Sequence, residues 1–146
     1  MTPRVLLHRL IELLPRRQPR YLGSRGVGQA WEDLAARHLK RAGYEILERN
    51  FRVRGGEIDF VARDGGTLCF IEVKGRSAAA YGPPAEAVTE EKQRRIWTAA
   101  EVYLRRERNR PRCRFDVVAI DATGPEARVE ILRAAFEGPP APPRPR

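Results

Sequence analysis

Hydrophobic residues along the 146-residue chain change their spacing several times, and each spacing predicts a different element. Residues 27 to 42, VGQAWEDLAARHLKRA, are apolar at helical intervals, and Gly43 follows where a helix C-terminus favours glycine. Residues 44 to 53, YEILERNFRV, alternate as a half-buried strand does, with Tyr44 and Phe51 inward. The apolar face of the predicted helix comprises Trp31, Leu34, Ala35, His38, Leu39 and Ala42.

A β-hairpin is predicted from residue 56 to residue 76, GEIDFVARDGGTLCFIEVKGR. Gly65 and Gly66 separate two strand patterns, and glycine readily adopts the positive φ of a tight turn. Such a turn places the charged side chains together on one face, through the pairs Asp64 with Thr67, Asp59 with Glu72, and Glu57 with Lys74. The core-facing side is then formed by Ile58, Phe60, Ile71 and Val73.

A second helix and two more strands follow the hairpin. Thr89 is the predicted N-cap, because Glu90 and Glu91 come next, where the helix dipole favours acid. The strands are RFDVVAI, 114 to 120, and RVEILRA, 128 to 134. The buried stripe of the helix comprises Ile96, Ala99, Ala100 and Tyr103. The order α-β-β-β-α-β-β with a right-handed crossover predicts an α/β fold in which helices flank a mixed central sheet.

The two ends of the chain differ from its middle. Residues 1 to 25 are predicted as a basic extension with a short amphipathic helix in VLLHRLIELL, and residues 137 to 146 as a disordered Pro-rich tail. Residues 26 to 136 then form one α/β domain. We expect a cytoplasmic protein with no membrane partner, because no segment is apolar enough to cross a bilayer and Cys69 and Cys113 fit small buried residues.

The charge of the chain favours a polyanionic partner. Its net charge is +9; residues 1 to 25 carry +5 and residues 137 to 146 carry +1, leaving +3 for the domain. Nucleic acid, before an acidic membrane surface, is the expected partner, and we expect DNA, although charge alone does not distinguish DNA from RNA. Phosphate contacts are predicted for Arg76, Lys92, Arg94 and Arg95, with a solvated helical face as the alternative for the last three. The run RRERNRPRCR, 105 to 114, is a denser candidate, or else a helix end whose arginines complement the dipole.

Asp59 opposite Glu72 would place like charges across a ladder, which is destabilising. Lys74 and a divalent cation, Mg²⁺ or Mn²⁺, are the candidates to hold them, since hard cations prefer carboxylate oxygens. Such a site suits phosphodiester hydrolysis. Lysine at position 74 is notable because the 28 basic residues include few lysines, and an ammonium differs from a guanidinium in compactness and adjustable pKa. The alternative is a solvated face of alternating ion pairs.

Three segments carry a resemblance to a known family: GEIDFVARDGGTLCFIEVKGR, AEAVTEEKQRRI and RFDVVAI. Together they resemble the YraN family of bacterial proteins, suspected nucleases, and Asp59 with Glu72-x-Lys74 is similar to the D…ExK signature of the restriction-endonuclease-like PD-(D/E)xK superfamily. The resemblance implies Asp59 and Glu72 as metal ligands, Lys74 as the catalytic lysine, and Glu32 as an accessory ligand or positioner of the attacking water. Trp31 stands before Glu32, where that family usually has a small residue.

Three functions are compatible with these features. The first is a metal-dependent endonuclease that hydrolyses phosphodiester bonds, on branched or structured DNA by analogy with junction resolvases of similar fold. The second is a nucleic-acid-binding module whose nuclease-like site is weak or inactive. The third is a scaffold in which the charged residues form only an ion-pair network. A homodimer is expected for the endonuclease, because two cuts need two copies.

Overall fold

The computed structural model describes residues 8–12, 24–77 and 88–139, and for residues 8–12, 24–27, 76 and 77 it describes the backbone alone. The elements are β1 (His8–Glu12), α1 (Ser24–Arg41), β2 (Glu45–Val53), β3 (Gly56–Asp64), β4 (Thr67–Ser77), α2 (Glu90–Leu104), β5 (Arg112–Ala122) and β6 (Ala127–Phe136). Most of the predicted loop GRSAAAYGPP and of the Pro-rich tail lies outside the described residues.

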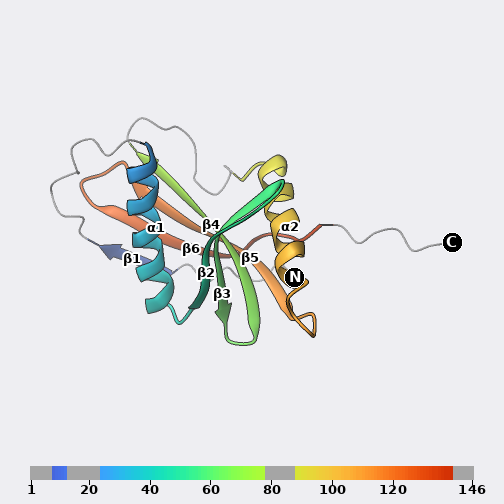
Figure 1. The fold of residues 1–146 in the computed structure, drawn as a ribbon. Helices are drawn as coiled ribbons and strands as arrows, with labels where there is room; N and C mark the ends of the chain where they lie inside the picture. The colour runs from blue at the N-terminus through green and yellow to red at the C-terminus, as the bar shows by residue number, and fades with distance from the viewer. Residues whose placement is uncertain (1–7, 13–23, 78–87, 140–146) are drawn as a thin grey trace.

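A single six-stranded sheet in the order β1-β6-β5-β4-β3-β2 forms the centre of the molecule. β4 and β5 are parallel and the other neighbours are antiparallel, so the predicted mixed sheet is confirmed. The crossover between the parallel strands contains α2. Figure 1 shows α1 and α2 on opposite sides of the sheet. The predicted restriction-endonuclease-like order of helices and strands is therefore present.

Each helix covers its own hydrophobic core. Phe60, Ala62 and Ile71 pack with the α1 residues Leu34 and Leu39. On the opposite face, the predicted α2 stripe of Ile96, Ala99, Ala100 and Tyr103 is buried against Ile58, Val61, Leu68 and Phe70. The predicted cap is also confirmed, since Thr89 Oγ1 accepts the Lys92 N–H at 3.2 Å. Both sheet faces are thus buried, and a polar group on either face needs a specific partner.

The predicted hairpin turn is confirmed, but the ladder beside it is shorter than expected. Gly65 has φ of 60°, and the pairs run from Asp64 with Thr67 to Phe60 with Ile71. The next predicted pairs, Asp59 with Glu72 and Glu57 with Lys74, are not part of the ladder. Ile58 also departs from the prediction, because it packs in the α2-side core while Phe60 lies in the α1-side core. Side-chain alternation therefore changes phase around Asp59.

The start of the described chain corrects a second prediction. His8–Glu12 is a strand that pairs antiparallel with β6, His8 opposite Ile131, and not part of an amphipathic helix. An isolated helix this short gains little from hydrogen bonding, whereas β6 would otherwise present the unpaired backbone of a sheet edge. Among the described residues, neither helix combines the length and hydropathy needed to cross a membrane.

Candidate active site

Asp59 lies where β3 separates from β4. Its Oδ2 accepts the Val73 N–H at 2.8 Å. If the ladder continued in the same register, Val73 would instead face Ile58 and bond to its carbonyl. A side chain thus replaces a backbone acceptor at the first position beyond the last pair. The side chain of Asp59 on β3 therefore links this position to β4.

The carboxyl groups of Asp59 and Glu72 are in contact. Burial and then the charge of Glu72 raise the pKa of Asp59, the Val73 N–H lowers it, and the pKa is about 7 instead of the ordinary 3.8. The two side chains also share a hydrogen bond. Glu72 is itself buried, with 4% of its side chain exposed. The sequence-based expectation that these acids lie together is met, although they meet beside the ladder and not within it.

The positive charge at this pair comes from Lys92. Its Nζ lies 3.1 Å from Glu72 Oε1, and the charges of Asp59 and Glu57 also act on it. Burial alone would lower the pKa of Lys92, but the charge of Glu72 and the hydrogen bond to it outweigh burial, so the pKa is raised. The sequence-based expectation assigns part of this neutralisation to Lys74 and the rest to a divalent cation, and places Lys92 at phosphate or on a solvated helical face. Lys74 is half-buried, two residues along β4 from Glu72 and thus on the same side of the strand.

Glu32, on α1, contacts β2, the strand that neighbours β3 and its residue Asp59. Its Oε2 accepts from Asn50 Nδ2 at 3.1 Å, and a small polar pocket there is lined by Gly28, Gln29, Glu32, Asn50 and Arg52. Asn50 has φ of 53° and lies on β2 between residues paired with Phe60 and Ile58, which sets it level with Asp59. Among the described residues, no three acids, histidines or cysteines gather as a metal-binding group, so Glu32 does not join Asp59 and Glu72 in one cluster.

Trp31, the departure from the family pattern, packs against Gly75. A Cβ on Gly75 would overlap the Trp31 indole ring. The contact joins α1 to β4 immediately after Lys74. A large residue before Glu32 is therefore accommodated because the facing strand position has no side chain.

The other predicted phosphate-binding residues lie in three places. Arg94 and Arg95 are exposed in the first half of α2, and Arg94 pairs with Glu90 at 3.4 Å. The side chain of Arg76 lies outside the described residues. The run 105 to 114 connects the end of α2 to the start of β5, where Arg112 pairs with Thr67, five residues before Glu72. At about 3.3 Å per residue this is about 16 Å from the acidic pair.

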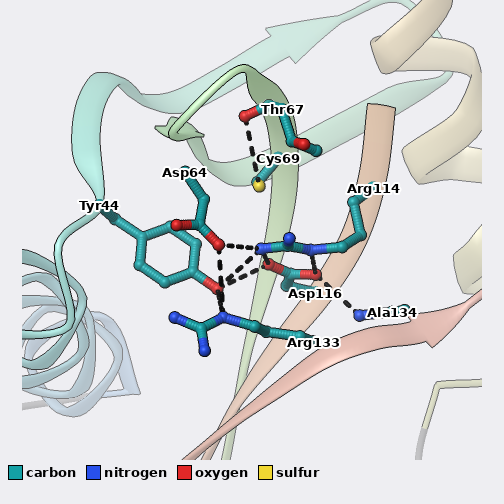
Figure 2. A network of polar contacts seen from close by, with 8 residues as sticks. All are labelled: Tyr44, Asp64, Thr67, Cys69, Arg114, Asp116, Arg133 and Ala134. Carbon is teal, nitrogen blue, oxygen red and sulfur yellow. Dashed lines mark hydrogen bonds and ion pairs between the residues drawn. The ribbon is translucent and has the colours of Figure 1, made fainter. Parts of the chain in front are cut away.

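Arg114 is not available for phosphate binding, which corrects its inclusion in that run. It belongs to a polar network on the α1 side of the sheet (Figure 2). Its guanidinium donates to both oxygens of the buried Asp116 at 2.8 and 2.9 Å and to Asp64 at 2.8 Å. Asp116 also accepts from the Tyr44 hydroxyl at 2.8 Å and the Ala134 N–H at 2.9 Å.

This network has a structural explanation. Ala134 has φ of 53°, and the β5–β6 register shifts between Phe115 and Val117, so Asp116 secures an irregularity of the ladder. The predicted burial of Cys69 is confirmed beside it, Cys113 is half-buried, and neither forms a disulfide.

The donor set of the acidic pair fits a magnesium or manganese ion that keeps water molecules. Two contacting carboxyl groups are hard oxygen donors, and once Asp59 has lost its proton they carry more negative charge than one ammonium balances. Mg²⁺ commonly takes only one or two carboxylates and completes its shell with water and substrate phosphate. The arrangement does not resemble an all-protein metal cage.

The sequence profile described as "Uncharacterised protein family UPF0102" matches residues 31–120, more than half of the chain. The chain belongs to the UPF0102 family. A UPF0102 protein of Geobacter metallireducens is 50% identical over 117 residues, which cover 80% of this chain and 96% of the relative. One from Symbiobacterium thermophilum is 51% identical over 116 residues, 77% of this chain and 98% of the relative. UPF0102 is the YraN family, so the resemblance is confirmed.

Two site features of this UPF0102 protein were missed by sequence reasoning. Lys92 had a signal: it stands three residues after the cap Thr89, and the scarcity of lysine noted for Lys74 applies equally to it. Asn50 had a weaker one, since asparagine is among the residues that tolerate positive φ. Neither its φ nor its bond to Glu32 follows from strand periodicity.

Proposed function

We propose that this UPF0102 protein is a metal-dependent endonuclease that hydrolyses phosphodiester bonds in nucleic acid, with branched or structured DNA as the substrate. The observation that carries the proposal is the contact of Asp59 with Glu72 where β3 and β4 separate. Two buried acids in contact destabilise the metal-free protein, and such an arrangement is typical of sites that bind a cation or move a proton.

Asp59 and Glu72 are the residues that would hold the ion, from two neighbouring strands. When bound, a divalent cation supplies positive charge that polarises the phosphodiester and makes a water molecule a better nucleophile. Lys74, on the same side of β4 as Glu72, is the group that would orient that water or offset charge on the reacting phosphate. Glu32 of α1, which accepts a hydrogen bond from Asn50 of β2, is a residue that would position the attacking water.

A nucleic-acid-binding module with a weak or inactive site is the second candidate. The observation that favours it is the ion pair of Glu72 with Lys92, which already supplies one positive charge at the pair. The module would retain salt-dependent DNA binding and would not cleave.

Cleavage of labelled duplex, single strand, flap and four-way junction, in Mg²⁺ and in Mn²⁺, tests the proposal. Lys74→Ala and Asp59→Asn should lose cutting while they retain DNA binding. Lys40→Ala is the matched control, because Lys40 is an exposed lysine on α1 and should cut like the unaltered protein. Tight binding without cutting of any substrate supports the module instead.

A further inference from the structure

Glu72 has one cationic partner among the described residues, and that partner is Lys92. The side chain of Glu72 is 4% exposed, whereas that of Lys92 is 32% exposed. The Lys92 side chain therefore reaches from solvent to the buried carboxylate of Glu72.

The backbone of Lys92 is held by the helix cap, whereas its side chain is long and flexible. Lys92 lies in the first turn of α2, and Thr89 Oγ1 holds its N–H at 3.2 Å. The flexible four-carbon stem of lysine lets the charged end take other positions without any change in the helix. An arginine here would be bulkier and would bind the carboxylate through a planar fork.

We propose that Lys92 is the resident counter-cation of the Asp59–Glu72 pair and that a divalent cation must displace it from Glu72. The inference rests on the proposed function, because it concerns the same pair. The Glu72 oxygen that faces Nζ at 3.1 Å would have to face an ion at about 2.0–2.1 Å. The two positive charges at that oxygen would repel each other, and the burial of Glu72 limits how far water screens this repulsion.

Charge balance makes the same point. Two ionised carboxylates and one divalent ion are neutral together, whereas retention of the ammonium beside them leaves one excess positive charge. Lys92 thus stabilises the metal-free protein and weakens its affinity for metal. Its removal should strengthen Mn²⁺ binding on the order of tenfold.

Mn²⁺ titration by calorimetry, on metal-stripped protein without nucleic acid, tests this inference. Lys92→Met should bind Mn²⁺ more tightly than the unaltered protein, while Lys92→Arg and Lys40→Met should not. Equal or weaker binding by Lys92→Met overturns the inference, because Lys92 would then help to hold Glu72 in its ligand position. Lys92→Gln, which can still donate to Glu72, serves as the second neutral variant if Lys92→Met does not fold.

An Asp59→Asn arm separates this inference from the proposed function. If Asp59→Asn binds Mn²⁺ as the unaltered protein does, the pair is not the metal site and both ideas fail. If Asp59→Asn loses binding but Lys92→Met is unchanged, only the role of Lys92 fails. Thermal unfolding gives an independent readout: in EDTA, Lys92→Met should melt below the unaltered protein, and Mn²⁺ should raise its melting temperature by more.

Discussion

The Asp59 carboxylate occupies the place of a backbone carbonyl, accepting the Val73 N–H at 2.8 Å just beyond the last pair of β3 and β4. One side chain therefore ends the ladder, satisfies a strand donor and contributes to the acidic pair. Structural and chemical roles coincide in this residue, and a substitution that preserves its oxygen acceptor is needed to separate them.

The first prediction concerns pH and the metal-free protein. The pKa of Asp59 in the folded chain is about 7, above its ordinary 3.8, because burial and then the charge of Glu72 raise it. The Val73 N–H and the charge of Lys92 lower this pKa, but by less. The folded chain thus keeps a proton that the unfolded chain has released. Stability due to this group should fall as pH rises from about 4 to about 7 and then level off.

Urea unfolding in EDTA at intervals from pH 4 to pH 8 measures this trend. Asp59→Asn keeps an oxygen acceptor for Val73 but has no proton to lose, so it should flatten this part of the profile. Asp33→Asn is the control: the hydrogen bond from Arg49 lowers the pKa of Asp33, and its loss should leave the fall between pH 4 and 7 intact. An identical fall in Asp59→Asn would show that another group is responsible.

The second prediction is that Trp31 and Gly75 are energetically coupled. Gly75→Ala should cost about 1–3 kcal/mol of unfolding free energy, because the new methyl overlaps the indole ring. In a Trp31→Ala background the same change should cost less than about 0.5 kcal/mol, and chemical denaturation of the four proteins of this cycle gives the coupling.

Gly28→Ala is the matched control for that cycle. It also adds a methyl at a glycine, on α1, but nothing lies within 4 Å of the added atom. Replacing glycine within a helix by alanine should raise stability by about 0.8–1 kcal/mol. Equal costs of Gly75→Ala in both backgrounds would mean that the overlap is relieved elsewhere.

The third prediction separates the Asp116 network from the acidic pair. Asp116→Ala should lower stability by about 1–3 kcal/mol, because the buried Tyr44 hydroxyl and the Ala134 N–H lose their acceptor and the half-buried Arg114 loses its main partner. Asp116→Asn retains acceptors and should cost less. Asp116 lies level with Ile71 on the α1 side of the sheet, whereas Glu72 pairs with Lys92 of α2. The folded fraction of either Asp116 variant should therefore bind Mn²⁺ like the unaltered protein in a calorimetric titration.

The helices, strands and turn were predictable because they follow from short-range patterns. Apolar spacing gave the α2 stripe, Thr89 gave its cap, and two glycines gave the hairpin. The helix predicted at the position of β1 was wrong because the pairing of β1 with β6 joins segments near the two ends of the chain, which local spacing does not encode. Asp116, inside the apolar run RFDVVAI, has partners from Tyr44 to Ala134 that no local pattern indicates.

The candidate site was predictable in its membership and less so in its geometry. Strict alternation placed Asp59 and Glu72 together, and they are in contact. Alternation also assumed a continuous ladder, and that assumption fails where Asp59 replaces a backbone acceptor. The ion-pair partner of Glu72, Lys92, comes from a helix distant in sequence, so strand spacing pointed to Lys74 and did not indicate Lys92.

The last prediction locates the nucleic-acid surface. If the acidic pair is the reaction centre, DNA must lie near the first half of α2, and Arg94 and Arg95 are exposed there. Arg94→Ala with Arg95→Ala should weaken duplex binding and reduce the slope of log affinity against log salt by about 0.9 per lost phosphate contact. Arg108→Ala with Arg112→Ala is the matched pair, also exposed but near the opposite end of β4 and β5 from the acidic pair. Fluorescence anisotropy from low to moderate salt measures both slopes. A greater loss in the second pair would place the DNA across the run 105 to 114, with the acidic pair outside the bound region.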